Sequence, residues 1–65
     1  MKRIYEFIDT ERFYDLLLNG RVVKTYAKRK YSRQQAEDHA SKEVQRAVRI
    51  FGNKNIEYNG SFINA

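Results

Sequence analysis

The sequence predicts a small α+β fold, in which one helix packs on one face of a three-stranded antiparallel sheet. Two observations indicate this class. The dipeptide Asn19-Gly20, a strong hairpin signal, separates two segments rich in β-branched, aromatic and leucine residues. A capping box, Ser32 followed by Gln35, then begins an amphipathic stretch that ends at Gly52. The predicted order is three strands, the helix and a short C-terminal strand.

Length and composition limit the classes of protein to consider. The 65 residues predict a single domain over 1–65, and the absence of cysteine excludes a disulfide framework. The longest apolar run, Leu16 to Leu18, is far shorter than the roughly 20 residues of a membrane span. We therefore expect a cytoplasmic protein without membrane contact. The net charge of +5 serves solubility alone, or attracts nucleic acid or acidic protein.

Residues 2–8 alternate in a way that predicts the first strand. Tyr5 and Phe7 would point to one side of the sheet and Ile4, Glu6 and Ile8 to the other. The turn over residues 9–11 contains no glycine, which leaves the register open. With Thr10 and Glu11 as a two-residue loop, the predicted pairs are Phe7 with Tyr14, Tyr5 with Leu16, Ile8 with Phe13 and Ile4 with Leu17.

The second and third strands form the hairpin over residues 12–30. A two-residue loop fixes its register, so the predicted pairs run from Leu18–Arg21 through Asp15–Lys24 to Phe13–Tyr26. This register separates two faces. The first face carries Tyr14, Leu16, Leu18, Val23, Thr25 and Ala27. The second face carries Phe13, Asp15, Leu17, Val22, Lys24, Tyr26, Lys28 and Lys30.

The helix is predicted between its Ser32 cap and Gly52, and we expect it to cover the first face. At helical spacing, its apolar residues fall within one arc: Ala36, Ala40, Val44, Ala47, Val48, Ile50 and Phe51. A short edge strand is predicted over residues 55–58. Asn59-Gly60 would then turn the chain, and Phe62 and Ile63 would pack back on the sheet or fray.

Few residues are suited to catalysis or metal binding. His39 is the only histidine, and no serine lies at a readable spacing from it. His39 and Glu43 are four residues apart on the helix, but two ligands do not complete a tetrahedral zinc site. We therefore expect no enzymatic activity, no metal and no cofactor.

The second face is the predicted binding surface, because one helix screens only one side of a sheet. Three alternatives stay open: the C-terminal segment covers it, another protein or a second copy binds it, or Phe13 and Tyr26 stack bases. The many aliphatic residues favour protein. The predicted partner-binding residues are Phe13, Leu17, Val22, Lys24, Tyr26 and Lys28. The alternative, direct binding of DNA or RNA, would use Lys24, Lys28, Arg29, Lys30 and Arg33.

The layout of residues 21–58 resembles several small phage host-takeover and anti-defence proteins. The shared features are an Asn-Gly hairpin, "S-x-x-Q-A" at the start of a helix and a short strand. Members include an inhibitor of bacterial RNA polymerase, anti-CRISPR proteins and an antitoxin against an RNase. The resemblance implies a phage-encoded, non-enzymatic inhibitor in the host cytoplasm, which binds a host defence or nucleic-acid-processing protein. It assigns no role to any single residue.

A second resemblance concerns three short segments. "LLLNGRVV", "QQAEDHA" and "FGNKNIEYN" resemble the hairpin, helix and terminal strand of AP2-type and integrase arm-type DNA-binding domains. The link over residues 26–31 lacks the Gly-aromatic-Asp-Thr turn of that family, and the helix is longer. This resemblance implies DNA reading by the sheet.

Overall fold

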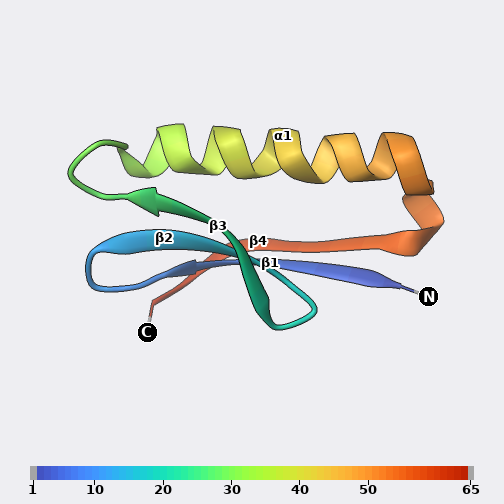
Figure 1. The fold of residues 1–65 in the computed structure, drawn as a ribbon, viewed down its shortest axis with the longest axis horizontal. Coiled ribbons are helices and arrows are strands. Elements are labelled where there is room, and N and C mark those ends of the chain that lie inside the picture. Colours follow the sequence, from blue (N-terminus) through green and yellow to red (C-terminus); the bar gives the residue numbers. More distant parts are fainter. Residues whose placement is uncertain (1, 65) are drawn as a thin grey trace.

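The chain folds into two layers, a four-stranded sheet and one helix that runs along one face of it (Figure 1). The computed structural model describes the backbone of residues 2–64 and the side chains of residues 2–59. Its elements are β1 (Arg3–Asp9), β2 (Phe13–Leu18), β3 (Arg21–Ala27), α1 (Arg33–Phe51), a short 3-10 helix (Asn53–Asn55) and β4 (Ile56–Asn64). The predicted α+β class is confirmed.

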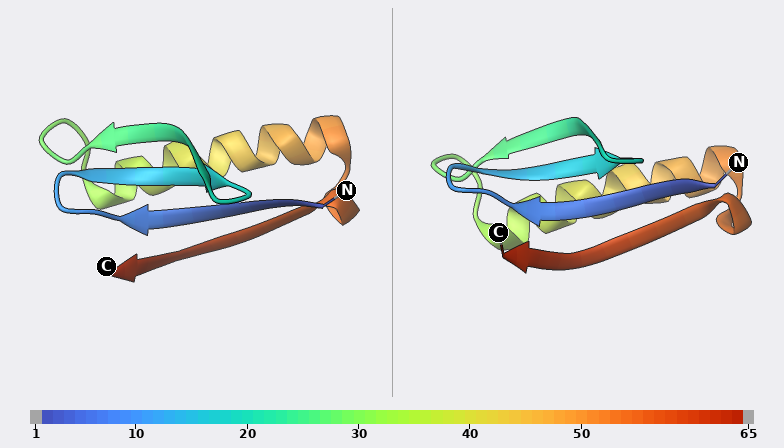
Figure 2. Two further views of the ribbon diagram at one scale, coloured as in Figure 1. Left: turned by 60° about the horizontal axis from the view of Figure 1, so that its bottom comes forward. Right: turned by 90° about the horizontal axis from the view of Figure 1, so that it is seen from below.

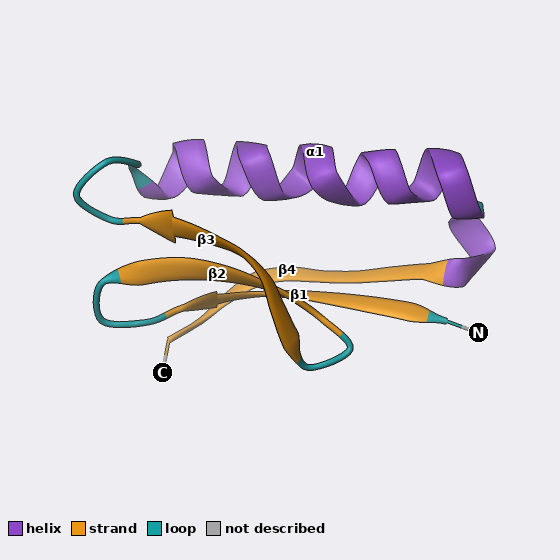
Figure 3. Ribbon diagram, in the orientation of Figure 1, coloured by secondary structure: helices purple, strands orange, loops and turns teal. Residues whose placement is uncertain are grey.

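The sheet is mixed, with the strand order β3-β2-β1-β4. β1, β2 and β3 pair antiparallel, whereas β4 pairs parallel with β1 at the opposite edge from β3. Figures 2 and 3 show why: α1 carries the chain back along the whole sheet after β3, so β4 starts beside the start of β1. A helical crossover of this kind is the usual way to add a parallel strand.

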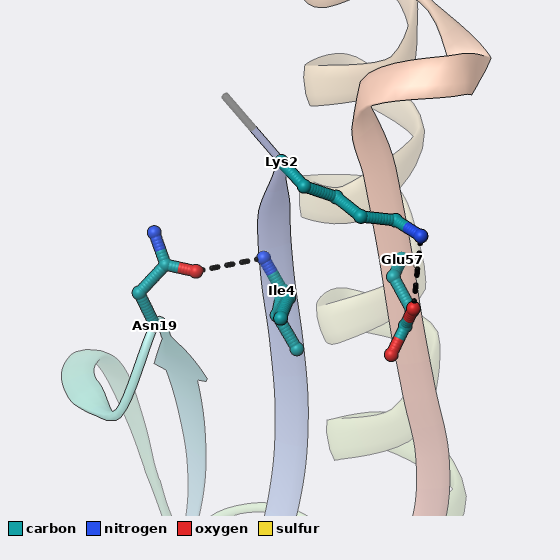
Figure 4. A network of polar contacts seen from close by, with 4 residues as sticks. All are labelled: Lys2, Ile4, Asn19 and Glu57. Atoms are coloured by element: carbon teal, nitrogen blue, oxygen red, sulfur yellow. Dashed lines mark hydrogen bonds and ion pairs between the residues drawn. The ribbon is translucent and has the colours of Figure 1, made fainter.

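The hairpin tip has the predicted conformation. Asn19 and Gly20 have φ angles of 51° and 83°, and a type I′ turn needs positive values at both positions. Asn19 also extends the pairing with β1. Its backbone N–H donates to the carbonyl oxygen of Ile4 over 2.8 Å. Its Oδ1 accepts from the Ile4 N–H over 2.9 Å (Figure 4). The tip is therefore fastened to the start of β1.

Beyond the tip, a β-bulge makes the predicted register of β3 wrong. Leu17 lies opposite Val22 as expected, but Leu16 lies opposite Lys24 and not opposite Val23. One additional residue in a strand turns every later side chain to the other face. The observed pairs after the bulge are Leu16–Lys24, Asp15–Thr25, Tyr14–Tyr26 and Phe13–Ala27.

The predicted faces of β1 are confirmed, although its register is shifted by two residues. Phe7 pairs with Leu16 and Tyr5 with Leu18, because the turn after β1 is longer than two residues. An even shift preserves the side of the sheet to which each residue points. Phe7 is accordingly fully buried and Tyr5 is 8% exposed.

The core lies between the sheet and α1. Phe7 and Leu16 are its largest fully buried side chains, and small residues of α1 pack on them. The predicted apolar arc is confirmed for Ala36, Ala40, Val44 and Ala47, which are buried. It is wrong for the last turn, where Ile50 and Phe51 are exposed. The Phe51 ring packs instead under the guanidinium of Arg3, 3.9 Å away.

Both predicted ends of α1 are confirmed. The Ser32 hydroxyl accepts from the N–H of Gln35 over 3.2 Å, and the Gln35 side chain accepts from the N–H of Ser32 over 2.9 Å. Gly52 follows the helix with φ of 90°, in the region that favours glycine.

The C-terminal strand is longer than predicted. The backbone continues as β4 through Asn59-Gly60, so the turn expected there is wrong, and a register shift takes its place. The backbone of β4 pairs with β1 along the sheet edge, with Ile63 opposite Ile8, and does not fold across the second face. The side chains of Phe62 and Ile63 lie outside the described residues.

Candidate functional site

The side of the sheet opposite α1 is not covered by any element of residues 2–64 (Figures 1 and 2). We call this side the open face. Strand pairing places the following residues on it: Ile4, Glu6 and Ile8 of β1, Phe13, Asp15 and Leu17 of β2, Val22, Thr25 and Ala27 of β3, and Glu57 of β4.

The apolar residues of the open face are only partly shielded. Phe13 is 41% exposed and Val22 is 49% exposed, whereas Leu17, Ile4 and Ile8 are half-buried by their neighbours in the sheet. Large apolar side chains that are left exposed together on one face usually mark a binding interface.

The centre of the open face is acidic, which corrects the expectation of a cationic surface. Glu6 lies between Leu17 of β2 and Asn59 of β4, and Asp15 lies between Ile8 and Thr25. Neither carboxylate forms an ion pair or hydrogen bond with a described side chain. Both are therefore available to a ligand.

A third carboxylate, Glu57, lies beside Ile4 at the β4 edge of this face. It pairs with the Lys2 ammonium over 3.2 Å (Figure 4). Both side chains are about half exposed, so this contact is a solvated surface ion pair that contributes little to stability.

The bulge in β3 divides the predicted partner-binding residues. Phe13, Leu17 and Val22 lie on the open face as predicted. Lys24 and Tyr26 do not, since they pair with Leu16 and Tyr14 on the helix side of the sheet. Their predicted place on the binding face is therefore wrong.

Tyr26 is part of the core. Its ring stacks on His39 at a centroid distance of 5.8 Å and meets the Tyr31 ring edge-on at 5.7 Å. Burial, and secondly the charge of Glu43, raises the pKa of the Tyr26 hydroxyl. The ring is not available to stack on a base, and His39 serves to cover it.

Cationic side chains gather at one end of the sheet, where the β1–β2 turn meets the β3–α1 turn. The N–H of Lys28 donates to the carbonyl oxygen of Arg12 over 3.0 Å and joins the two turns. We call this region the basic end. It comprises Arg12, Lys28, Arg29, Lys30 and Arg33.

The basic end contains four of the five residues predicted to bind nucleic acid. Lys24 is the exception, because it lies farther along β3 on the helix side. The sequence interpretation missed Arg12, which directly precedes β2. Its proximity to the other cations depends on the register of β2 and β3, which the sequence interpretation had wrong. The observed register puts Phe13 opposite Ala27, so Arg12 adjoins Lys28.

Lys28 is already engaged within the basic end. Its ammonium forms an ion pair with Asp9 and lies 5.0 Å from the centroid of the Tyr14 ring. Its charge is thereby directed to the helix side of the sheet, away from the open face. The Asp9 ion pair therefore occupies part of the Lys28 ammonium that was predicted to contact a partner.

A hollow of about 470 Å³ lies between the two turns. It is lined by Glu11, Arg12, Phe13, Ala27, Lys28 and Arg29. Phe13 and Ala27 belong to the open face, so the hollow forms the end of that face nearest the cations.

Comparison with known proteins supplies no family for this chain. A scan against protein-family models found no match, and searches of curated proteins and of solved structures found none either. In the part of the chain that the structure describes, no helix is both long enough and apolar enough to cross a membrane. Within the described residues, no group of three or more His, Cys, Asp or Glu side chains is placed to hold a metal ion.

Proposed function

We propose that this chain is a non-enzymatic binding protein whose open face contacts a partner protein. The observation that carries the proposal is the apolar surface around Leu17 and Val22, which no element of the described chain covers. Apolar area that is left open on a small domain, where each buried side chain counts, is best explained by a partner.

The chemistry of the open face favours protein over nucleic acid. Surfaces that read single strands depend on exposed aromatic rings, and Phe13 is the aromatic residue on the described part of this face. The surrounding residues are aliphatic, and Glu6 and Asp15 would repel phosphates. The alternative of direct nucleic-acid binding therefore does not suit the open face.

The same carboxylates define the partner. Glu6 and Asp15 lie among apolar residues and complement a surface that is apolar and basic. A second copy of the chain fits less well, because two open faces in contact would bring their carboxylates together. We infer a foreign protein and set the homodimer aside.

Basic surfaces are typical of proteins that bind nucleic acid. The proposed partner is therefore a protein of a nucleic-acid-handling complex, whose basic surface the open face would occlude. This agrees with the class of host protein that the phage resemblance implies. The phage origin, the inhibitory role and the location in the host cytoplasm belong to the proposal as sequence-based predictions.

The test is capture of partners from a bacterial lysate by the tagged chain and by matched variants. We expect Leu17→Thr and Glu6→Lys to reduce capture of the specific partner at least tenfold, as loss of a central interface contact typically does. Ile50→Thr is the control, because Ile50 is 67% exposed on α1 and lies away from the open face. Circular dichroism and thermal unfolding of each variant show that the fold is retained.

Two results would contradict the proposal. One is a partner retained equally by Leu17→Thr, Glu6→Lys and the parent chain. The other is sedimentation equilibrium that shows a dimer disrupted by Leu17→Thr, which would assign the open face to a second copy.

A further inference from the structure

The hollow at the basic end has a different chemistry from the rest of the open face. We infer that it binds single-stranded nucleic acid, with one base on the Phe13 ring and flanking phosphates on Arg12 and Arg29. The inference goes beyond the proposed protein contact and does not depend on it. The two sites share Phe13 but differ in their charged residues.

The floor of the hollow suits a base. Phe13 lies opposite Ala27, whose methyl group is too small to cover the ring, and Phe13 is 41% exposed. Exposed aromatic faces are the platforms on which single-stranded bases stack. The volume of about 470 Å³ lies within the roughly 300–1,000 Å³ of small-ligand sites.

The cations come from both sides of the hollow. Arg12 belongs to the β1–β2 turn and Arg29 to the β3–α1 turn, and both side chains are exposed. Neither forms an ion pair with another described residue. Lys28 also lines the hollow, but its ammonium is paired with Asp9, so we assign the phosphate contacts to the two arginines. Two arginines that line the same hollow as an exposed aromatic ring suit a stacked base whose flanking phosphates carry negative charge.

Backbone hydrogen bonds fix the shape of the hollow. Besides the bond between Lys28 and Arg12, the carbonyl oxygen of Phe13 accepts from both the N–H and the hydroxyl of Thr10, each over 2.9 Å. On the other side, the carbonyl oxygen of Ala27 accepts from the N–H groups of Lys30 and Tyr31 over 3.0 and 2.9 Å. A preformed site loses less conformational entropy when a ligand binds.

The remaining lining residue, Glu11, narrows the class of ligand. Its carboxylate at the hollow opposes a bare inorganic anion, so the arginines alone do not make a general phosphate site. A stacked base supplies the additional attraction. Duplex nucleic acid does not offer an unstacked base, which leaves a single strand as the fitting ligand.

The experiment is fluorescence anisotropy of the full chain with labelled oligothymidylate and oligouridylate, from about 50 to 200 mM salt. We expect Phe13→Leu, which keeps the apolar packing but removes the ring, to weaken binding roughly tenfold. Phe13→Tyr, which keeps a ring, retains binding. Arg12→Gln together with Arg29→Gln removes two cations. We expect the negative slope of log K against log salt to become shallower by about 1.4.

Two further variants sharpen this test. Glu11→Gln strengthens binding, because it removes the one carboxylate of the hollow. The matched control is Lys42→Gln with Arg49→Gln, which removes the same charge from exposed positions on α1 and leaves the slope unchanged.

The inference is overturned if the parent chain does not bind at about 50 mM salt, or if the α1 control loses as much affinity as the arginine variant. Equal affinity for duplex DNA, or full competition by inorganic phosphate, overturns it as well. Leu17→Thr distinguishes the two sites without changing the charge. It reduces partner capture at least tenfold but leaves oligonucleotide affinity intact, so one proposal can fail while the other holds.

Discussion

At the scale of single residues, neighbours in the sequence occupy opposite environments. Leu16 is fully buried under α1, while Leu17 is half-buried on the open face. The two side chains are the same size and lie on the same strand. Comparing substitutions at Leu16 and Leu17 therefore shows how much burial on each side of the sheet contributes to the free energy of unfolding.

We predict that Leu16→Ala lowers the free energy of unfolding by about 2–5 kcal/mol, the usual range for a buried leucine. Leu17→Ala should cost less than half as much, since part of its side chain is already in water. Urea denaturation followed by circular dichroism measures both. Equal losses would mean that the open face is covered, and the protein-contact proposal would lose its basis.

Tyr26 predicts how stability depends on pH. Burial first, and then the charge of Glu43, raises the pKa of this hydroxyl above its ordinary value of about 10. The unfolded chain thus releases this proton at lower pH than the folded chain. The contribution of the protonated Tyr26 hydroxyl to the free energy of unfolding is fully present below about pH 10. It is lost as the pH rises through the pKa that this group has in the folded chain.

We therefore expect the urea midpoint of the parent chain to fall between about pH 9 and pH 11, and Tyr26→Phe to lessen that fall. We expect Tyr58→Phe to lessen the fall as well, because burial first, and then the charge of Glu37, raises the pKa of the Tyr58 hydroxyl. A midpoint of Tyr26→Phe that falls as steeply as that of the parent chain would place Tyr26 in contact with solvent.

At the scale of elements, the bulge in β3 decides which residues reach the core. A regular register would leave Tyr26 on the open face and place Val23 opposite Leu16. Burying a large apolar side chain is worth about 1.5–3 kcal/mol, whereas one ladder hydrogen bond contributes about 0.5–1.5 kcal/mol. The packing of Tyr26 on His39 and Tyr31 therefore outweighs the interrupted ladder.

Deletion of the bulge residue tests whether the burial of Tyr26, and not the bulge itself, stabilises the fold. Val23 is the additional residue, so its deletion gives a regular hairpin in which Tyr14 still faces Tyr26. We expect the deletion variant to unfold cooperatively, within about 1 kcal/mol of the parent. Deletion of Asp15 from the regular strand β2 is the control. It turns Tyr14 to the open face, and we expect it to abolish cooperative thermal unfolding.

At the scale of the whole molecule, β4 joins the two ends of the chain. It pairs parallel with β1, with Glu57 opposite Ile4, and forms the edge strand of the sheet. Sequence position does not indicate this arrangement, because a strand after a helix can return to either edge and in either direction.

A pair of cysteines tests the arrangement directly, since the chain has no cysteine of its own. Paired strands lie about 4.8 Å apart, within the range of Cα separations that a disulfide spans. We expect Ile4→Cys with Glu57→Cys to form a disulfide on oxidation and to add about 4 kcal/mol of stability in the chain-entropy estimate. Mass spectrometry and urea denaturation provide the readouts.

The diagonal pair, Ile4→Cys with Asn59→Cys, is the control, because Asn59 lies opposite Glu6. Oxidation of the diagonal pair in preference to the direct pair would show that the register of β4 is different.

The sequence by itself determined the features that depend on neighbours along the chain. The Asn19-Gly20 turn, the Ser32 cap and the alternation of β1 follow from local backbone conformation and hydrogen bonding, and each appears as predicted. The first half of the α1 arc follows in the same way, since its alanines recur at helical spacing.

Only the tertiary structure decided the side of Tyr26, the parallel pairing of β4 and the meeting of Arg12 with Lys28. Each results from competition between contacts far apart in the sequence, chiefly the burial of an aromatic ring against the regularity of a ladder. A hairpin register predicted from the length of its loop does not take into account the helix that packs on the sheet. The predicted binding site was wrong for the same reason. One additional residue in β3 places Lys24 and Tyr26 on the helix side of the sheet and not on the open face.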